Sequence, residues 1–318
     1  MRYAFIVNPA SGQGKHDGGV AAEIDELIRG NPNRDIKLYY TRGKKDASYL
    51  AGLLAEEASM KEDEIVVFAC GGDGTIQEVA NGIYGHENAV LGVVPVGSGN
   101  DLVRQLGREK NSSVRYRKLP DHFDGMVTRM DLIRMSWIEN GEERSHLITN
   151  GINIGFDGNT AILAHKLKKL PLISGSASYL LAAAMNLAGK KGQKLRITAD
   201  GKNFHTGCLL LTTAANGGFC GGGIQSCPNA DLFDGKIELL VVKDIPRKTF
   251  ITLFPKYKAG RLFSIKGIEE ITSYTQAENI LIEPMLGQTM KFVGDGEIFE
   301  TGSLRIEIVP KAIKVLVL

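Results

Sequence analysis

The stretch from residue 65 to residue 85, IVVFACGGDGTIQEVANGIYG, constrains the fold more than any other part of the chain. Its apolar and largely β-branched start, Ile65 to Cys70, predicts a short strand buried on both faces. Glycines then turn the chain at Gly71–Gly74, and apolar residues at helical spacing follow, which predicts a helix. A strand, a glycine turn and a helix N-terminus form an anion site, because free backbone N–H groups and the helix dipole point at the ligand.

Asp73 is the unusual residue of this turn. A carboxylate beside a phosphate site repels the ligand unless a cation lies between them, so the turn predicts a Mg–nucleotide site with Asp73 near the metal. The alternative is a tight turn in which Asp73 only caps the helix. The turn by itself leaves both interpretations open.

Strands and helices alternate from residue 3 to about residue 107. This alternation predicts a doubly wound, mostly parallel sheet, whose strands end at one common edge where ligands bind. The loop that follows the first strand begins at Asn8. It is not a Walker A loop, because His16 stands where that motif has Ser or Thr. It is not a dinucleotide fingerprint either, because Asp17 stands where that motif has its third glycine. Four segments are expected to line the edge: Asn8–Gly14, Thr41, Gly71–Thr75 and Gly97–Asn100.

After about residue 127 the pattern changes to short strands with turn signals such as Asp200-Gly201. We therefore expect an α/β domain at residues 1–127 and a second, mainly antiparallel β domain at residues 128–310. Two helices are expected in the second domain, near residues 177–187 and 247–258. The apolar run at about 311–318 needs cover on both faces, so we expect it to return to the first domain.

Composition restricts the classes of function. The 318 residues are 43% hydrophobic and 23% charged with a net charge of +2, which is ordinary for a globular protein and gives no electrostatic case for nucleic acid. No apolar run approaches transmembrane length, and the first residues lack a signal-peptide layout, so a cytoplasmic location is expected. The four cysteines are expected to be free thiols: Cys70, Cys208, Cys220 and Cys227.

Three motifs resemble the catalytic domain of diacylglycerol kinases and of related soluble bacterial lipid kinases: Asn8-Pro-x-Ser-Gly12, Gly71-Gly-Asp-Gly-Thr-x-x-Glu-Val-x-Asn-Gly82 and Pro95-x-Gly-Ser-Gly-Asn-Asp101. A fourth match is Asp295-Gly-Glu297. NAD kinases and phosphofructokinase-like folds share the second motif in part, whereas the third and fourth discriminate better. Ser98 stands where the family usually has Thr, and it keeps the hydroxyl.

The resemblance implies two domains with the nucleotide between them and a phosphofructokinase- or NAD-kinase-like first domain. It implies ATP and Mg²⁺ as cofactors, and phosphorylation of diacylglycerol or a similar lipid alcohol to a phosphatidic-acid-type phospholipid. The implied metal site holds a structural Mg²⁺ at Asp231, Asp234 and Lys236, although the residues alone also fit a loop before a strand. The implied nucleotide contacts are Asn8, Pro9, Ala10, Ser11, Gly12, Thr41, Gly71, Gly72, Asp73, Gly74, Thr75, Ile76, Gln77, Ser98 and Asn100.

The catalytic prediction concerns the turn Gly294-Asp295-Gly296-Glu297. Phosphoryl transfer needs a group that accepts the hydroxyl proton, and a carboxylate is the natural base. We expect Glu297 to be that base, with Asp295 and Asp73 on the Mg–ATP side. Asp-Gly also favours a plain hairpin turn, and the choice among the three carboxylates stays open.

Contact with a membrane is expected at a basic and apolar segment formed by Lys166, Lys168, Lys169, Leu170, Leu172 and Ile173. Such a segment favours peripheral binding at the inner face of the cell membrane, where the lipid substrate lies. The alternative is a solvated charge run before a core helix. A homodimer is left open, as are two other functions: an NAD kinase-like phosphotransferase with a soluble substrate, and a non-catalytic nucleotide-binding regulator.

Overall fold

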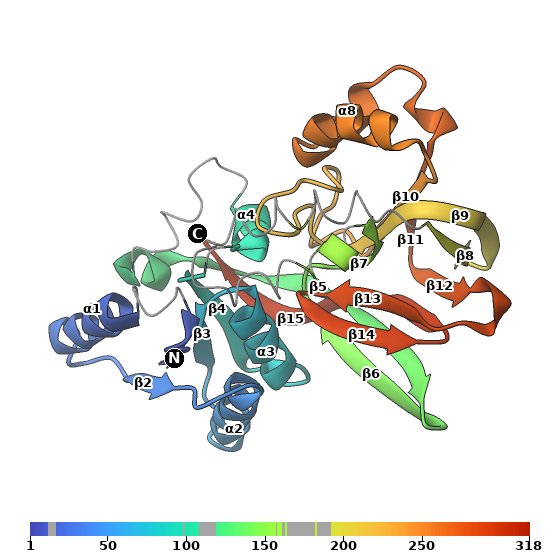
Figure 1. Cartoon of the computed structure of the whole chain (residues 1–318). Helices are drawn as coiled ribbons and strands as arrows, with labels where there is room; N and C mark the ends of the chain where they lie inside the picture. Colours follow the sequence, from blue (N-terminus) through green and yellow to red (C-terminus); the bar gives the residue numbers. More distant parts are fainter. Residues whose placement is uncertain are drawn as a thin grey trace. The chain divides into compact units, whose positions relative to one another are not determined.

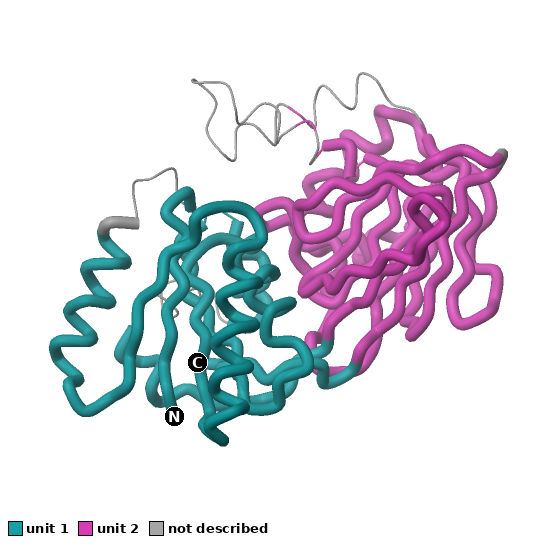
Figure 2. Tube along the Cα trace, turned by 90° about the horizontal axis from the view of Figure 1, so that it is seen from below, with its two compact units in different colours: residues 1–131, 310–318 teal, residues 132–309 magenta. Residues whose placement is uncertain are grey.

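A computed structural model describes residues 1–11, 17–97, 99–107, 119–156, 158–160, 163, 182 and 192–318. The chain forms two compact units (Figure 2). Unit 1 comprises residues 1–131 and 310–318, and unit 2 comprises residues 132–309. The sequence pattern predicts a division at 127/128, with a return to the first domain from about residue 311.

Unit 1 is built on a parallel sheet in the order β4-β3-β1-β2. Its strands are β1 Arg2–Val7, β2 Ile36–Tyr40, β3 Ile65–Gly71 and β4 Ala89–Pro95. The long strand β15 comprises Leu304–Val317. Its last part pairs in parallel with β4 through Lys314↔Val90 and Val315↔Leu91. The apolar end of the chain therefore belongs to this sheet.

The helices of unit 1 are α1 Asp17–Gly30, α2 Asp46–Met60, α3 Asp73–Ile83 and α4 Asp101–Leu106, followed by the 3₁₀ helix η2 Leu119–Asp124. α1 packs on the sheet face that carries the stacked rings of Phe5 and Phe68, whose centroids are 4.3 Å apart. α2 and α3 cover the other face (Figure 1). Because both faces are covered, β1, β3 and β4 are buried along their whole length, as their continuous apolar runs predict.

Unit 2 contains a mainly antiparallel sheet. The two units together confirm the predicted fold class, a doubly wound α/β domain followed by an antiparallel β domain. The strand order of unit 2 is β14-β13-β7-β9-β8-β12-β15, while β10 pairs with β9 and β11, and β5 pairs with β6. The strands are β5 Met126–Glu139, β6 Glu142–Ile148, β7 Gly151–Gly155, β8 Gln193–Ala199, β9 Lys202–Ala215, β10 Ile237–Lys243, β11 Thr272–Ala277, β12 Asn279–Pro284, β13 Met290–Gly294 and β14 Glu297–Thr301.

One long helix of unit 2, α8 Arg247–Lys258, confirms the helix predicted at 247–258. Three short 3₁₀ helices follow it: η3 Leu262–Ser264, η4 Ile268–Glu270 and η5 Met285–Gly287. The helix predicted near 177–187 lies almost wholly outside the described residues. The predicted Asp200-Gly201 turn joins β8 to β9, and the four cysteines are free. Within the described ranges, no helix is long and apolar enough to cross a membrane.

Candidate functional site

The glycine turn of unit 1 is shorter than predicted, because α3 already begins at Asp73. Gly72 is the N-cap and makes no side-chain cap hydrogen bond, and its carbonyl accepts the N–H groups of Thr75 and Ile76 at 3.0 and 3.1 Å. Gly74 is exposed, and a Cβ at this position would meet nothing within 4 Å. The first turn of α3 therefore faces open space without a capping side chain, which suits an anion.

Two glycines allow the backbone segments of the site to pack closely. A Cβ on Gly71 would lie 2.3 Å from the Thr75 hydroxyl oxygen, and a Cβ on Gly97 would lie 2.5 Å from the Cα of Gly72. The Gly71 carbonyl accepts the N–H groups of Val96 and Gly97 at 2.9 and 3.2 Å. Any side chain at residue 71 or 97 would push the loop after β4 away from the start of α3.

Asn8, at the end of β1, joins a third loop to the same place. Its side-chain amide donates to the Thr75 hydroxyl at 3.1 Å, and its Oδ1 accepts the Ala10 N–H at 3.0 Å. Ser11 donates its N–H to the Asn8 carbonyl at 3.0 Å, and Thr41 donates its N–H to Val7 at 2.9 Å. The structure thus brings residues 8–11, Thr41, 71–75 and 97 together at one edge of the sheet.

Other predicted nucleotide contacts differ in what they offer. The Ile76 side chain is fully buried in the core, so only its backbone is available to a ligand, and the Gln77 side chain is also buried. Pro9 and Ala10 are exposed. Gly12 and Ser98 lie outside the described residues.

The Asp73 carboxylate accepts hydrogen bonds from backbone N–H groups at the start of α4 as well as from its own N–H at the start of α3. Its Oδ1 accepts the Leu102 N–H at 3.3 Å, at the start of α4. Burial raises the pKa of the Asp73 carboxyl, although the backbone N–H groups of Leu102, Asp101 and Asn100 oppose the shift. Asp73 therefore connects α3 to the beginning of α4.

Asn100 adds a further oxygen beside Asp73. It adopts the left-handed conformation with φ 55°, and its amide donates to the Gly97 carbonyl at 2.8 Å. Its Oδ1 is buried and accepts no hydrogen bond from the described residues. A carboxylate, an unused amide oxygen and an uncapped helix N-terminus fit a phosphate group accompanied by a hydrated divalent cation.

The Asp295-Gly296 turn of unit 2 connects β13 to β14 as a two-residue hairpin with φ 44° and 85°. The Asp295 carboxylate accepts the N–H and the hydroxyl of Thr149, each at 2.6 Å, and the N–H groups of Asn150 and Gly151 at 3.1 and 3.0 Å. Its own N–H donates to Gly151 at 3.1 Å. Burial raises the pKa of this carboxyl, against the effect of the four donors. These hydrogen bonds of Asp295 therefore hold the β13–β14 hairpin against residues 149–151, at the start of β7.

The segment at 149–151, which sequence reasoning missed, is itself held by the end of β9. The Asn150 carbonyl accepts the N–H groups of Asn216 and Gly217 at 2.8 and 2.9 Å. The Asn216 amide donates to the Thr149 carbonyl at 2.9 Å, and the Asn150 amide donates to the Phe219 carbonyl. No local pattern marks residues 149–151, because their partners are far away in the sequence.

Glu297 begins β14 opposite Gly294 and is half-buried. Residues alternate between the two faces of a strand, so Glu297 shares a face with Phe299. Phe299 stacks on Phe292 with centroids 5.3 Å apart and packs edge-on against Trp137. Glu297 thus sits on a hairpin fixed at one end by Asp295 and along its face by aromatic packing.

The predicted metal segment is a loop that precedes β10, which both interpretations allow. Asp231 and Asp234 accept the N–H groups of Phe233 and Lys236 at 3.2 and 2.9 Å. The Lys236 ammonium pairs with Glu278, which raises the pKa of Lys236. Within the described ranges, no three His, Cys, Asp or Glu side chains gather into a metal site. The residues fit a cation only as a hydrated ion held by Asp234 and backbone oxygens.

Glu238 lies next to this loop and was not predicted. Its side chain is buried, and its Oε1 accepts the Gln276 amide at 2.8 Å. The same amide nitrogen lies 3.4 Å from Oδ2 of Asp234. Glu238 Oε2 is buried, and the Tyr274 side chain lies near Glu238: burial and then a hydrogen bond to Glu238 raise the pKa of Tyr274. The Gln276 amide and the Tyr274 side chain therefore accompany the buried Glu238 carboxylate next to Asp234.

Comparison with known proteins adds independent observations. The family model described as the diacylglycerol kinase catalytic domain matches residues 2–135, and the one described as the YegS C-terminal NAD kinase beta sandwich-like domain matches residues 151–317. A diacylglycerol kinase of Bacillus subtilis (strain 168) is 28% identical over 308 residues, which cover 93% of this chain and 89% of the relative. A Pectobacterium atrosepticum protein named "Probable lipid kinase YegS-like" is 28% identical over 303 residues, with coverage of 93% and 92%.

A solved structure of a diacylglycerol kinase from Bacillus anthracis matches with a TM-score of 0.68 at 24% identity, over 100% of this chain and 97% of that one. This match concerns the fold alone. The two family models follow each other along nearly the whole chain, and their order agrees with the α/β and β units described above. The chain belongs to the family of the YegS C-terminal NAD kinase beta sandwich-like domain, whose model matches more than half of its residues, and the residues before that domain match the diacylglycerol kinase catalytic domain.

Proposed function

We propose that the protein is an ATP-dependent kinase that phosphorylates the hydroxyl of diacylglycerol or a similar lipid alcohol to give a phosphatidic-acid-type phospholipid. The observation that carries the proposal is the uncapped start of α3, open at Gly74 and bordered by the Asp73 carboxylate. Family membership supports the lipid as the acceptor.

In this proposal, unit 1 holds the nucleotide. The backbone N–H groups at the start of α3 bind phosphate oxygens, and the loops around Asn8 and Gly97 enclose them. Asp73 and Asn100 hold the cation that accompanies ATP. When bound, Mg²⁺ supplies the charge neutralisation that phosphoryl transfer needs.

Unit 2 supplies the base. Glu297 accepts the proton of the lipid hydroxyl while the new O–P bond forms and the bond between the β- and γ-phosphates breaks, so that ADP leaves. Asp295 was predicted on the Mg–ATP side. Since both of its oxygens already accept hydrogen bonds from residues 149–151, we give it the role of fixing the turn that carries Glu297.

Three further parts of the proposal concern binding and location. The loop of Asp231, Asp234 and Lys236 would hold a structural Mg²⁺, with Asp234 as the carboxylate ligand. The enzyme meets its lipid substrate at the inner face of the cell membrane as a peripheral protein. The membrane segment predicted at 166–173 lies outside the described residues, and a homodimer stays a prediction.

The test is incubation with radiolabelled ATP, Mg²⁺ and a panel of detergent-dispersed lipid alcohols, followed by chromatography of the products. A labelled phospholipid from diacylglycerol or a similar lipid alcohol is the expected result. NAD belongs in the panel, because labelled NADP without labelled lipid would favour a soluble-substrate phosphotransferase. ATP binding without turnover of any acceptor would favour a nucleotide-binding regulator.

A further inference from the structure

The segment from residue 247 to residue 266, formed by α8 and η3, concentrates positive charge in unit 2. It contains six cationic side chains and no carboxylate, whereas the whole chain has a net charge of only +2. None of the six forms an ion pair with a residue that the structure describes, and the nearest acids in the sequence, Asp244, Glu269 and Glu270, flank the segment. The six exposed cations are Arg247, Lys248, Lys256, Lys258, Arg261 and Lys266.

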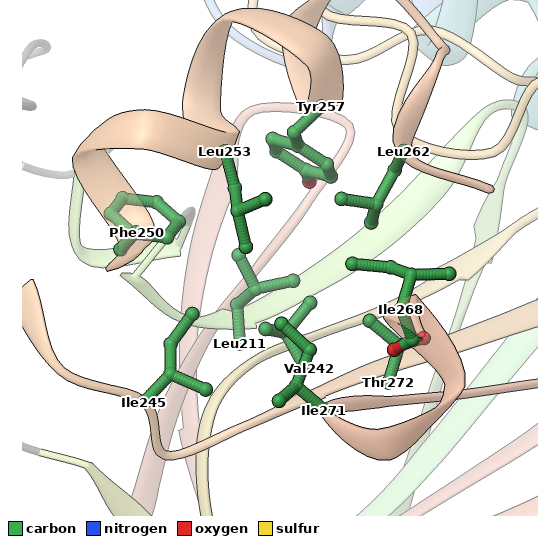
Figure 3. Close-up of a pocket in the computed structure, with 10 residues that line it drawn as sticks. All are labelled: Leu211, Val242, Ile245, Phe250, Leu253, Tyr257, Leu262, Ile268, Ile271 and Thr272. Atoms are coloured by element: carbon green, nitrogen blue, oxygen red, sulfur yellow. Dashed lines mark hydrogen bonds between the residues drawn. The ribbon is translucent and has the colours of Figure 1, made fainter. Parts of the chain in front are cut away.

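The inner face of α8 is packed against unit 2. Phe250, Leu253 and Tyr257 point from the helix toward Leu211 and neighbouring apolar side chains (Figure 3). Phe250 also meets the ring of Phe156 with centroids 4.6 Å apart. The cavity beneath the helix has a volume of about 10 Å³, which is too small for an acyl chain. Only the outer face of α8 is therefore available to a partner.

The outer face combines charge with an apolar side chain. Because residues 250, 253 and 257 face inward, helical spacing turns Lys248, Ile251 and Lys256 outward. The Ile251 side chain is 55% exposed, which is high for a large apolar residue. An isoleucine between lysines suits a partner that offers both anionic groups and an apolar interior.

We propose that this outer face of α8, with the six cations of residues 247–266, docks on an anionic lipid bilayer. A bilayer meets both requirements, since its headgroups attract the cations and its acyl boundary accepts Ile251. A nucleic acid would leave Ile251 without a partner. This inference rests on the proposed function, in which the substrate is dissolved in the membrane. The helix α8 belongs to unit 2, which also carries Glu297.

The expected effect is large enough to measure. Each Lys or Arg near an anionic surface contributes roughly a fivefold gain in partitioning, so neutralising three should weaken binding by about 100-fold at low salt. Salt should weaken wild-type binding as well, because the attraction falls off over a Debye length.

The experiment is cosedimentation of the full chain with sucrose-loaded vesicles of phosphatidylcholine, with or without phosphatidylglycerol. The test variant is K248Q/K256Q/K258Q. The matched control is K194Q/R196Q/K202Q, which removes from the β8–β9 hairpin of the same unit three exposed cations that form no ion pair with a described residue. We expect the test variant to lose binding to the anionic vesicles and the control to bind like the wild type. Ile251→Asp should remove the part of the binding that persists at high salt.

Equal loss in both triple variants, or equal wild-type binding to neutral and anionic vesicles, would overturn the proposal. Turnover of a short-chain diacylglycerol in neutral detergent micelles separates this inference from the proposed function. Both triple variants should keep wild-type turnover there, since neither changes the site. If the wild type shows no turnover, the kinase proposal fails, and the comparison of the two triple variants still decides whether α8 docks.

Discussion

The carboxylate of Asp295 accepts both the N–H and the hydroxyl of Thr149 at 2.6 Å, across 146 residues of sequence. This pair joins the β13–β14 turn to the segment before β7. The turn carries Glu297 two residues later, so the position of the proposed base depends on a threonine that no motif marks. The relationship leads to a prediction about stability and its dependence on pH.

Thr149→Val should destabilise the protein by about 1–3 kcal/mol near neutral pH, because a buried carboxylate loses a hydroxyl donor. Burial raises the pKa of Asp295, and the Thr149 hydroxyl is the largest opposing cause, so its loss raises the folded-state pKa further. A group with a raised folded-state pKa loses its stabilising contribution as pH rises through that pKa. The deficit of the variant should therefore be larger at about pH 7 than at about pH 4.

Urea unfolding at the two pH values, with chelator present, measures this deficit. Thr149→Ser is the matched control, since it keeps the hydroxyl and should restore most of the stability. A deficit that is the same at both pH values would show that Asp295 is not the group through which Thr149 acts.

Gly74→Val should abolish ATP binding and leave the fold intact. A Cβ at residue 74 meets nothing within 4 Å, so the side chain would enter only the space that we assign to phosphate. Gly71→Ala is the contrasting variant, because its Cβ would lie 2.3 Å from the Thr75 hydroxyl and should lower the melting temperature. Calorimetric titration with ATP and Mg²⁺ measures affinity, and unchanged affinity in the Gly74 variant would contradict the site.

Much of the fold follows from local sequence signals. Continuous apolar runs such as Ile65–Cys70 indicate strands that need cover on both faces, and the glycines and helical spacing that follow them indicate the crossover helices. The glycines of residues 71–74 predict a turn that lasts to Gly74, whereas α3 already begins at Asp73. Gly74 is tolerated in the first turn of the helix, where its N–H has no intrahelical partner in any case.

The site was predictable only where its residues lie in the same loop. The glycine motifs indicate where we propose that phosphate binds, but the hydrogen bond from the Leu102 N–H to Asp73 joins residues 29 positions apart. The hydrogen-bond donors of Asp295 are still farther away in the sequence. Glu238 is recognised only from the structure, in which it is buried and accepts a hydrogen bond from Gln276. These contacts depend on strand order and register, which local patterns do not specify.

Asp234→Ala should lower the melting temperature in Mg²⁺ buffer to the value that the wild type shows with chelator. A cation that binds only the folded state stabilises it by mass action, and Asp234 is the proposed carboxylate ligand. Glu278→Gln is the control, because it breaks the neighbouring ion pair with Lys236 and leaves Asp234 in place. If wild-type melting without nucleotide is indifferent to Mg²⁺, the proposed cation site is wrong.

Glu297→Gln should lower kcat by about 10²–10⁴-fold and leave the affinity for ATP nearly unchanged. Gln keeps the shape of the side chain and removes its basicity. We assign the base to Glu297, which is half-buried at the start of β14, next to the turn that Asp295 fixes through its hydrogen bonds with residues 149–151. Steady-state kinetics at saturating lipid, together with ATP titration, separates an effect on the chemical step from an effect on binding.

Asp73→Asn is the comparison that makes this assignment decisive. Its carboxylate lies at the start of α3 and bonds to α4, so its loss should change the Mg²⁺ concentration needed for activity as well as kcat. Glu297→Gln should leave the Mg²⁺ dependence as it is, because the proposed role of Glu297 concerns a proton and not the cation. Near-wild-type kcat in Glu297→Gln, with an inactive Asp73→Asn or Asp295→Asn, would transfer the role of base to the residue whose loss stops turnover.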